Sequence, residues 1–415
     1  MNNPTTYYGA WYVPDARGMY THKFSGTLTF FGNRPSTLDL IHEPNSGSIS
    51  TICHHDVLWG EDAYGTKYSL FDATLVKEHD FTKITFLVRF ILVGKHVQSL
   101  DEPCFDTCWV KYPFLNRWAL DSRFDVEFAD DNKTTITLDL SARHPFLSVD
   151  IEKDLRLMLW GHITDKLTRF DIIASQATNL NIDTLDYAPL NLYLKTISEF
   201  SQFLSVALFA EQLPSEVIFA QKGVKVNYPL LFDSQSSTEP WVLPLIKFNE
   251  LKGKMSDILK QWHFNYGQIA PIGKNLIRSL KKDSAFDTPD FLIVAQALDG
   301  FYKRFVNKKD GTDTRQYKHQ IDKLLKQFEN VTALQECNID SEVLTQSRHK
   351  YSHLIPDDDE DVKLAVKGDD LYWLTQKCIV LLTCCILNML GLTTEEINLC
   401  FKDSPIEQIT ISIPL

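Results

Sequence analysis

Residues 189–208 read PLNLYLKTISEFSQFLSVAL, and they divide the chain into two regimes. Apolar side chains recur there at three- and four-residue steps, at Leu190, Leu194, Ile197, Phe200, Leu204 and Leu208. This spacing predicts an amphipathic helix. Strand-like patterns precede this helix and helical patterns follow it, so the sequence predicts an α+β chain.

The N-terminal regime, from Tyr7 to about Ile173, has the pattern of short strands separated by turn signals. We expect strands at Ser25–Phe30, Ser36–His42, Thr66–Val76, Lys83–Val93, Phe124–Phe128 and Thr134–Leu140, and a closing pair at Glu216–Ala220 and Val224–Tyr228. The chain shows no repeat of fixed period, which argues against a propeller or solenoid. The pattern therefore predicts an antiparallel, sandwich-like β-rich domain.

The C-terminal regime is helical throughout. We expect helices at Ile246–Phe264, Asn275–Lys281, Pro289–Asn307, Arg315–Glu329, Ser341–Leu354 and Asp369–Leu392, with N-caps at Asp340, Ser341 and Asp370 and a C-cap at Gly391. Pro356 ends the fifth helix near Leu354. The segment 234–240, SQSSTEP, is the expected linker. We therefore expect a β-rich N-terminal domain over 1–240, a helical connector over 241–284 and an all-α bundle over 285–415.

Composition and charge exclude several classes of protein. With 415 residues the chain is long enough for two or three domains, and its 44% hydrophobic and 23% charged residues are typical of a globular protein. The net charge of −12 argues against a polycationic nucleic-acid binder. The basic residues gather in 247–350, with 18 Lys and Arg against 13 Asp and Glu, whereas 351–415 has 4 against 11.

The expected compartment is the cytoplasm. The N-terminal sequence lacks the basic and apolar regions of a signal peptide. The longest apolar run, 378–392, is shorter than the roughly 20 residues that span a bilayer, so we expect a buried helix and no membrane association. The eight cysteines form no disulfide framework.

One short segment has the residues for chemistry: 348–353, RHKYSH. Its Arg-x4-His spacing is not specific by itself, because Arg17 and His22 show the same spacing in a strand-like segment. Its context differs, since it ends one expected helix and precedes the long apolar helix. Asp299 lies near the end of an earlier helix, in ALDGFYKRF.

The residue types suit the cleavage of RNA without a metal. A histidine with an ordinary pKa near 6.5 transfers protons at neutral pH, and the arginine fork binds phosphate. On a regular helix Arg348 and His353 lie about 140° apart. A frayed helix end, or a second copy of the motif across a two-fold interface, would bring such groups together.

In these residues the chain resembles the HEPN superfamily, and within it the Apea-like HEPN proteins of anti-phage defence. The motif of this family is Arg, then Asn, Asp or His, then a few residues and His, and RHKYSH has this form. The β-rich segment also looks like the N-terminal domain of this group. The resemblance implies a C-terminal HEPN-like helical bundle that pairs as a dimer, or a higher oligomer, with two motifs forming one composite site.

The resemblance implies an endoribonuclease that needs no cofactor and cleaves host RNA, with tRNA the favoured substrate, in abortive infection. Arg348 and His353 would be catalytic, leaving a 2′,3′-cyclic phosphate and a 5′-hydroxyl. His349 and Asp299 would support the site, although Asp299 also fits a simple helix-surface acid. Lys350 and Tyr351 would contact the RNA. The β-rich domain would sense a phage-derived trigger or restrain the nuclease.

Alternatives remain open from the sequence. The HEPN domain could be a non-catalytic module that only dimerises or binds RNA. Zinc could be bound by His349 and His353, or by a set in the β-rich domain: Cys53, His54, His55, Cys104 and Cys108. The acidic run Asp357–Asp361 fits either a solvated loop or an inhibitory element that repels RNA. Neither a GxxxxGK[ST] nor a Gly-x-Ser-x-Gly motif is present.

Overall fold

The computed structural model describes residues 4–14, 18–20, 22–41, 53–79, 83–119, 124–128, 134–138, 144–167, 172–233, 237–240, 243–280, 287–307 and 316–413. The chain forms two compact units. The first consists of residues 1–115, 120–198 and 213–237. The second consists of residues 116–119, 199–212 and 238–415.

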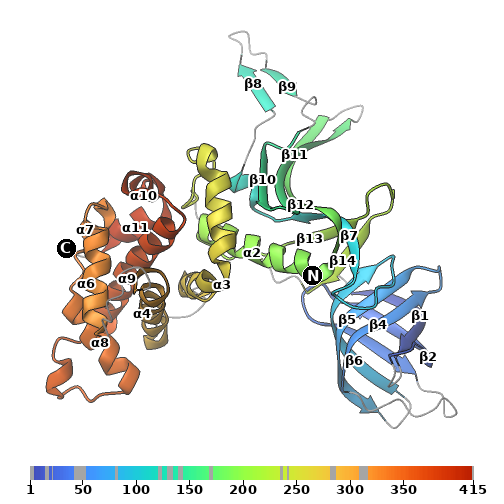
Figure 1. The fold of residues 1–415 in the computed structure, drawn as a ribbon, viewed down its shortest axis with the longest axis horizontal. Helices are drawn as coiled ribbons and strands as arrows, with labels where there is room; N and C mark the ends of the chain where they lie inside the picture. Colours follow the sequence, from blue (N-terminus) through green and yellow to red (C-terminus); the bar gives the residue numbers. More distant parts are fainter. Residues whose placement is uncertain are drawn as a thin grey trace. The chain divides into compact units, whose positions relative to one another are not determined.

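Six strands of the first unit close into an antiparallel barrel, coloured in shades of blue in Figure 1. They are β1 (Thr5–Val13), β2 (His22–Phe30), β3 (Ser36–Ile41), β4 (His54–Asp62), β5 (Lys67–His79) and β6 (Lys83–Val93). The order is β6-β3-β2-β1-β4-β5, and β5 pairs again with β6. Alternate side chains along each strand point inward. They form a core that includes Trp11, Leu28, Leu38, Leu58 and Phe86.

A close approach inside the barrel fixes one glycine. The ring of Trp11 lies against the backbone of Gly60 in β4, and a Cβ at Gly60 would come within 2.1 Å of that ring. Trp11 is fully buried. Only glycine leaves room for an indole at this position.

The rest of the sheet extends from one edge of β6. It consists of β7 (Pro103–Lys111), β10 (Leu147–Glu152), β11 (Leu155–Leu167), β12 (Ile172–Pro189), β13 (Glu216–Ala220) and β14 (Tyr228–Phe232), in the order β10-β11-β12-β7-β13-β14-β6. The first half of β6 pairs with β3, and its last residues pair with β14 through Leu92 and Leu230. A separate hairpin joins β8 (Phe124–Phe128) and β9 (Thr134–Leu138). Helix α1 (Leu115–Trp118) follows β7, and α2 (Leu190–Leu208) follows β12.

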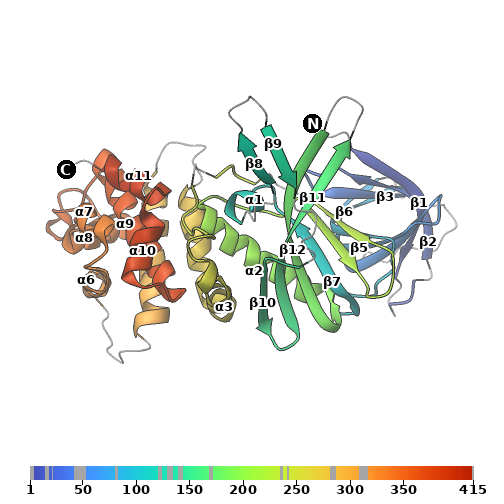
Figure 2. The ribbon, with the colours of Figure 1, turned by 90° about the horizontal axis from the view of Figure 1, so that it is seen from above.

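The second unit is helical. After a 3-10 turn, η1 (Lys252–Lys254), it contains α3 (Met255–Leu280), α4 (Thr288–Phe301), the π-helical η2 (Tyr302–Val306), α6 (Tyr317–Gln327), α7 (Thr332–Cys337), α8 (Ser341–His353), the 3-10 turn η3 (Glu360–Val362), α9 (Gly368–Met389), α10 (Thr394–Phe401) and α11 (Pro405–Ser412). Helix α9 lies in the middle of the bundle, as Figures 1 and 2 show. It contacts α3, α4, α6, α7, α10 and α11. Its cysteines Cys378, Cys384 and Cys385 are buried among apolar side chains.

The predicted fold class is confirmed: an antiparallel β-rich N-terminal part is followed by a helical C-terminal part. Most expected strands and the helix at 190–208 form within a few residues of the expected ends. The strand expected at Val224–Tyr228 lies later, at Tyr228–Phe232, because residues 221–224 form a turn. Gly223 has a φ of +80° in this turn, and both carboxylate oxygens of Asp106 accept the N–H of Lys222.

Some helix predictions were wrong. The helices expected at 246–264 and 275–281 are one helix, α3, which runs through Pro271. Its buried face continues on both sides of the proline with Ile269, Ile272 and Leu276, so packing outweighs the missing N–H. Asp340 caps α8 as predicted, whereas the N-cap of α9 is Lys367 and not Asp370. The short helices α7, α10 and α11 were not predicted.

Candidate active site

Helix α8 carries the RHKYSH segment in its last two turns. The Asp340 carboxylate caps its start by accepting the N–H groups of Glu342 and Val343 at 2.8 and 3.2 Å. The helix ends because Leu354 adopts a left-handed conformation with φ +54°, and the N–H of Ile355 then bonds to the carbonyl of Lys350 at 3.0 Å. Pro356 follows and prevents continuation. His353 is therefore the last residue of a well-defined helix.

The Arg348 guanidinium lies against α4 and α6. Its Nη2 is 3.5 Å from Oδ2 of Asp299, and its central carbon lies 4.4 Å from the centre of the Tyr317 ring. The side chain is 29% exposed, and its Nε finds no hydrogen-bond acceptor among the described residues. The guanidinium is thus held by a carboxylate and an aromatic ring. Its Nε is buried, so any further acceptor must be bound by the terminal Nη groups of this partly exposed side chain.

Asp299 and Tyr317 are themselves held in place. Asp299 lies near the end of α4, where its Oδ2 also accepts a hydrogen bond from Nζ of Lys303 at 2.8 Å. The Asp299 side chain is 16% exposed, so it is not a simple surface acid. The hydroxyl of Tyr317 donates to the carbonyl of Ala295 at 3.1 Å, and burial raises the pKa of this phenol well above its usual value.

His349 and His353 share a face of α8, as their spacing predicts. Their rings meet edge to face with centroids 5.0 Å apart. Both residues are exposed. The His353 imidazole is therefore open to solvent, and Arg348 extends from a different side of the same helix.

Lys350 and Tyr351 are engaged within the unit. The Lys350 side chain is 7% exposed, and its Nζ lies 2.5 Å from Oδ1 of Asp357. Nζ of Lys367 lies 2.5 Å from the other oxygen of the same carboxylate. The hydroxyl of Tyr351 donates to the carbonyl of Val366 at 2.8 Å. These contacts join the end of α8 to the segment just before α9.

The acidic run Asp357–Asp361 thus starts beside the motif. The hydrogen bond from Lys350 has the larger effect and that from Lys367 the smaller, and together they lower the pKa of Asp357 to about 2. This carboxylate is therefore ionised at neutral pH. Asp359 caps the turn η3 through the N–H of Asp361 at 2.9 Å. All five acidic residues are exposed.

The comparisons with known proteins decide the family. The family model described as ApeA N-terminal domain 1 matches residues 6–262, which is more than half of the chain. The chain belongs to the ApeA family. A second model, Apea-like HEPN, matches residues 292–396, and this range contains Asp299, Tyr317 and the whole RHKYSH segment. No curated protein and no solved structure gives a match.

Membership in the ApeA family confirms the predicted resemblance in both parts of the chain. At the level of the family, the HEPN match indicates a nuclease or an RNA-related role in anti-phage defence. Sequence reasoning singled out Asp299 but missed Tyr317 and Lys303. Tyr317 has no sequence signal as a partner of Arg348, because only the packing of α6 on α8 brings its ring there.

The zinc alternative has no geometric support in this ApeA chain. Within the residues that the structure describes, no three His, Cys, Asp or Glu side chains are placed to hold a metal ion. Cys104 and Cys108 are buried in β7, and burial raises the pKa of the Cys104 thiol to about 12. Cys53 is exposed. Cys104 and Cys108 are therefore buried residues of the sheet, whereas Cys53 lies just before β4.

Helix α9 is long and apolar enough to cross a membrane by length and composition alone. However, 78% of its most apolar window is buried within the protein. This agrees with the prediction of a buried helix and is typical of the core helix of a soluble protein.

Proposed function

We propose that this chain is a metal-independent endoribonuclease in which Arg348 and His353 act on the scissile phosphate. The observation that carries the proposal is their different placement on α8. Arg348 is held by Asp299 and Tyr317 with donors to spare, and His353 is exposed at the end of the helix. A held cation and a solvent-facing imidazole are the two groups that this reaction needs.

In the proposed reaction the 2′-hydroxyl of the RNA loses its proton and attacks the phosphorus. The bond from phosphorus to the 5′-oxygen breaks, and that oxygen takes up a proton. His353 transfers protons, and Arg348 stabilises the negative charge that develops on the phosphoryl oxygens. The products are a 2′,3′-cyclic phosphate and a 5′-hydroxyl.

The proposal includes a homodimer, or a higher oligomer, formed through the HEPN domain. Because Arg348 and His353 project from different sides of α8, a motif from a second copy completes the site. Leu354 next to the motif is 88% exposed and Leu364 is 49% exposed, which supports a contact surface at this end of the unit. His349 supports the site, and Lys350 and Tyr351 approach the RNA only if their present contacts open.

Biologically, we place the enzyme in the cytoplasm, where it cleaves host RNA, with tRNA favoured, to abort phage infection. Residues 1–240 would respond to a phage-derived trigger or restrain the nuclease, because an unrestrained ribonuclease would kill its host.

The direct test incubates the full-length protein with total cellular RNA, with and without excess chelator, and maps new 5′ ends. We expect 5′-hydroxyl ends at defined sites, in equal amounts with chelator present. His353→Ala should lose this cleavage and the toxicity while keeping the oligomeric state, and Ser352→Ala serves as the neighbouring exposed control.

Cleavage by His353→Ala at the wild-type rate would overturn the catalytic assignment. If the wild type is toxic to its host, binds RNA and forms a stable oligomer but does not cleave RNA, the non-catalytic module would be favoured. Loss of activity in chelator would favour a metal enzyme.

A further inference from the structure

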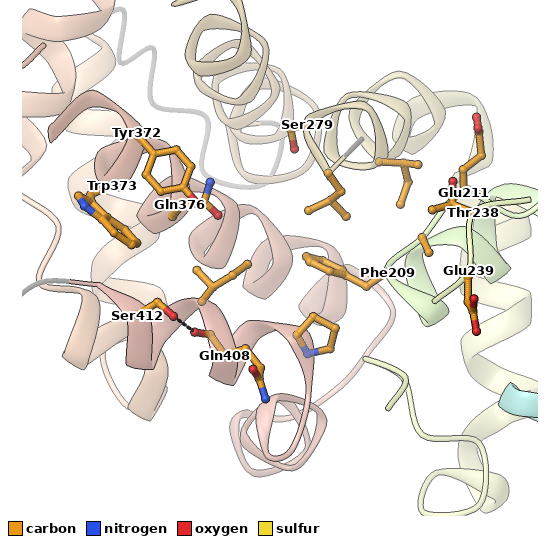
Figure 3. A pocket seen from close by; sticks show the side chains of 15 residues that line it. Phe209, Glu211, Thr238, Glu239, Ser279, Tyr372, Trp373, Gln376, Gln408 and Ser412 are labelled. Carbon is orange, nitrogen blue, oxygen red and sulfur yellow. Dashed lines mark hydrogen bonds between the residues drawn. The ribbon is translucent and has the colours of Figure 1, made fainter. Parts of the chain in front are cut away.

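The helical unit contains a cavity of about 400 Å³ that none of the RHKYSH residues lines (Figure 3). Its walls come from residues 209–211 just after α2, residues 238–239, the end of α3, the first turns of α9, and α11. This volume is within the range of small-molecule sites. No part of the proposed nuclease reaction uses this cavity.

A buried amide faces the cavity. Gln376 of α9 is only 6% exposed and lines the wall, yet its amide makes no hydrogen bond in the described parts of the chain. Most of the side chain is buried, and its polar end is open to the cavity, where a ligand can pair with it. The Gln376 amide offers a donor and an acceptor side by side. It can therefore pair with a ligand that carries an acceptor next to a donor along one edge.

Aromatic rings flank this amide. Tyr372 and Trp373, one turn earlier on α9, meet at 68° with centroids 4.8 Å apart, and Figure 3 shows them on the same side of the cavity as Gln376. Aromatic side chains stack on the faces of nucleobases, and this stacking does not depend on which base is bound. This side of the cavity therefore fits a flat heterocycle.

The opposite side is acidic. Glu211 and Glu239 lie there with Thr238, as Figure 3 shows, and Arg117 pairs with the Glu239 carboxylate at 3.2 Å. Among the described residues that line the cavity, none is Lys, Arg or His. Carboxylates accept hydrogen bonds from sugar hydroxyls and repel phosphate. The lining thus favours a sugar without phosphate.

We propose that this cavity binds an unphosphorylated purine nucleoside. The adenine edge pairs with the Gln376 amide, as glutamine pairs with adenine elsewhere, and the ring contacts Tyr372 or Trp373. The ribose hydroxyls face Glu211 and Glu239. The site is separate from the proposed RNA site, so this inference does not depend on the nuclease function.

The test titrates full-length protein with adenosine in a calorimeter. Saturable 1:1 binding is expected, and Gln376→Leu, which keeps the volume but removes the amide, should weaken it at least about tenfold. The matched control is Gln335→Leu, an exposed glutamine of α7 away from the cavity, which should bind as the wild type does. Absence of heat and of any thermal shift at millimolar adenosine would overturn the proposal.

A further arm defines the ligand class. AMP should bind at least tenfold more weakly than adenosine; equal or tighter binding of AMP would overturn the assignment of an unphosphorylated ligand. If Gln376→Leu fails to fold, as circular dichroism would show, Trp373→Ala replaces it, because Trp373 is only partly buried. Undiminished adenosine affinity in Trp373→Ala and in a folded Gln376→Leu would place the nucleoside elsewhere.

Discussion

The carboxylate of Asp299 in α4 accepts a hydrogen bond at 3.5 Å from Arg348 in α8, across 49 residues of sequence. The same oxygen binds Lys303, and the Tyr317 ring packs against the guanidinium. Arg348 is therefore held by two other helices, α4 and α6, before any substrate arrives. In the proposed enzyme this prepares a cation for the phosphate without the cost of ordering a free side chain.

Replacing Asp299 should release Arg348 without removing its charge. We expect Asp299→Asn to reduce RNA cleavage about tenfold to 100-fold, because a small misplacement of a reacting group has effects of this size. The measurement is single-turnover cleavage of a defined RNA. Lys303→Ala is the control, since Lys303 is 59% exposed and its Nζ binds the same oxygen. Equal losses in both variants would contradict a specific role for Asp299.

The shape of the Arg348 side chain should matter as well as its charge. Arg348→Lys keeps the charge but loses the planar fork and the flat contact with Tyr317. We expect cleavage to fall by about 100-fold or more, as when a donor to a developing oxyanion is lost. Tyr317→Phe keeps the ring and should retain most activity, whereas Tyr317→Leu should not. Full activity of Arg348→Lys would show that only charge is needed.

Acid should break the contact between the end of α8 and the loop that follows it. The pKa of Asp357 is lowered to about 2 by Lys350 and Lys367, from a usual 3.8. Its contribution to folding is therefore complete above pH 3.8 and is lost as the pH falls through about 2. The carboxyl carbon shift of Asp357, followed by NMR, should show this low midpoint.

Lys350→Met tests the cause of that shift, because methionine fills the buried space without a charge. The Asp357 midpoint should then move up toward its usual value. A wild-type midpoint near 3.8 would mean that the two lysines do not hold the carboxylate in solution.

A methyl group at Gly60 should destabilise the barrel. Because the Trp11 ring occupies the space of a Cβ there, Gly60→Ala should lower the free energy of unfolding by about 1–3 kcal/mol. Gly253→Ala is the matched control, since a Cβ at Gly253 meets no atom within 4 Å. Urea unfolding monitored by tryptophan fluorescence measures both. An unchanged midpoint in Gly60→Ala would show that the indole can move aside at little cost.

Local signals predicted the parts of this fold that depend on neighbouring residues. The alternation of apolar and polar residues predicted most barrel strands. The N-cap at Asp340 and the helix end before Pro356 predicted α8. The pairings β1–β4 and β3–β6 and the return of β14 to β6 join strands that are distant in the sequence, and periodicity does not encode these contacts. The RHKYSH motif is a local pattern and could be recognised in the sequence. The contact of the Tyr317 ring with Arg348 depends on helix packing and could not be predicted.

The connectivity of the barrel strands has a consequence for the order in which the chain folds. Each of its six strand pairings joins residues between Thr5 and Val93. Of the barrel strands, β14 pairs with β6 alone. A nascent chain that has left the ribosome through Val93 already holds all the partners for a closed ring of hydrogen bonds. The barrel can therefore form during translation, well before helix α8 with its arginine and histidine has been synthesised.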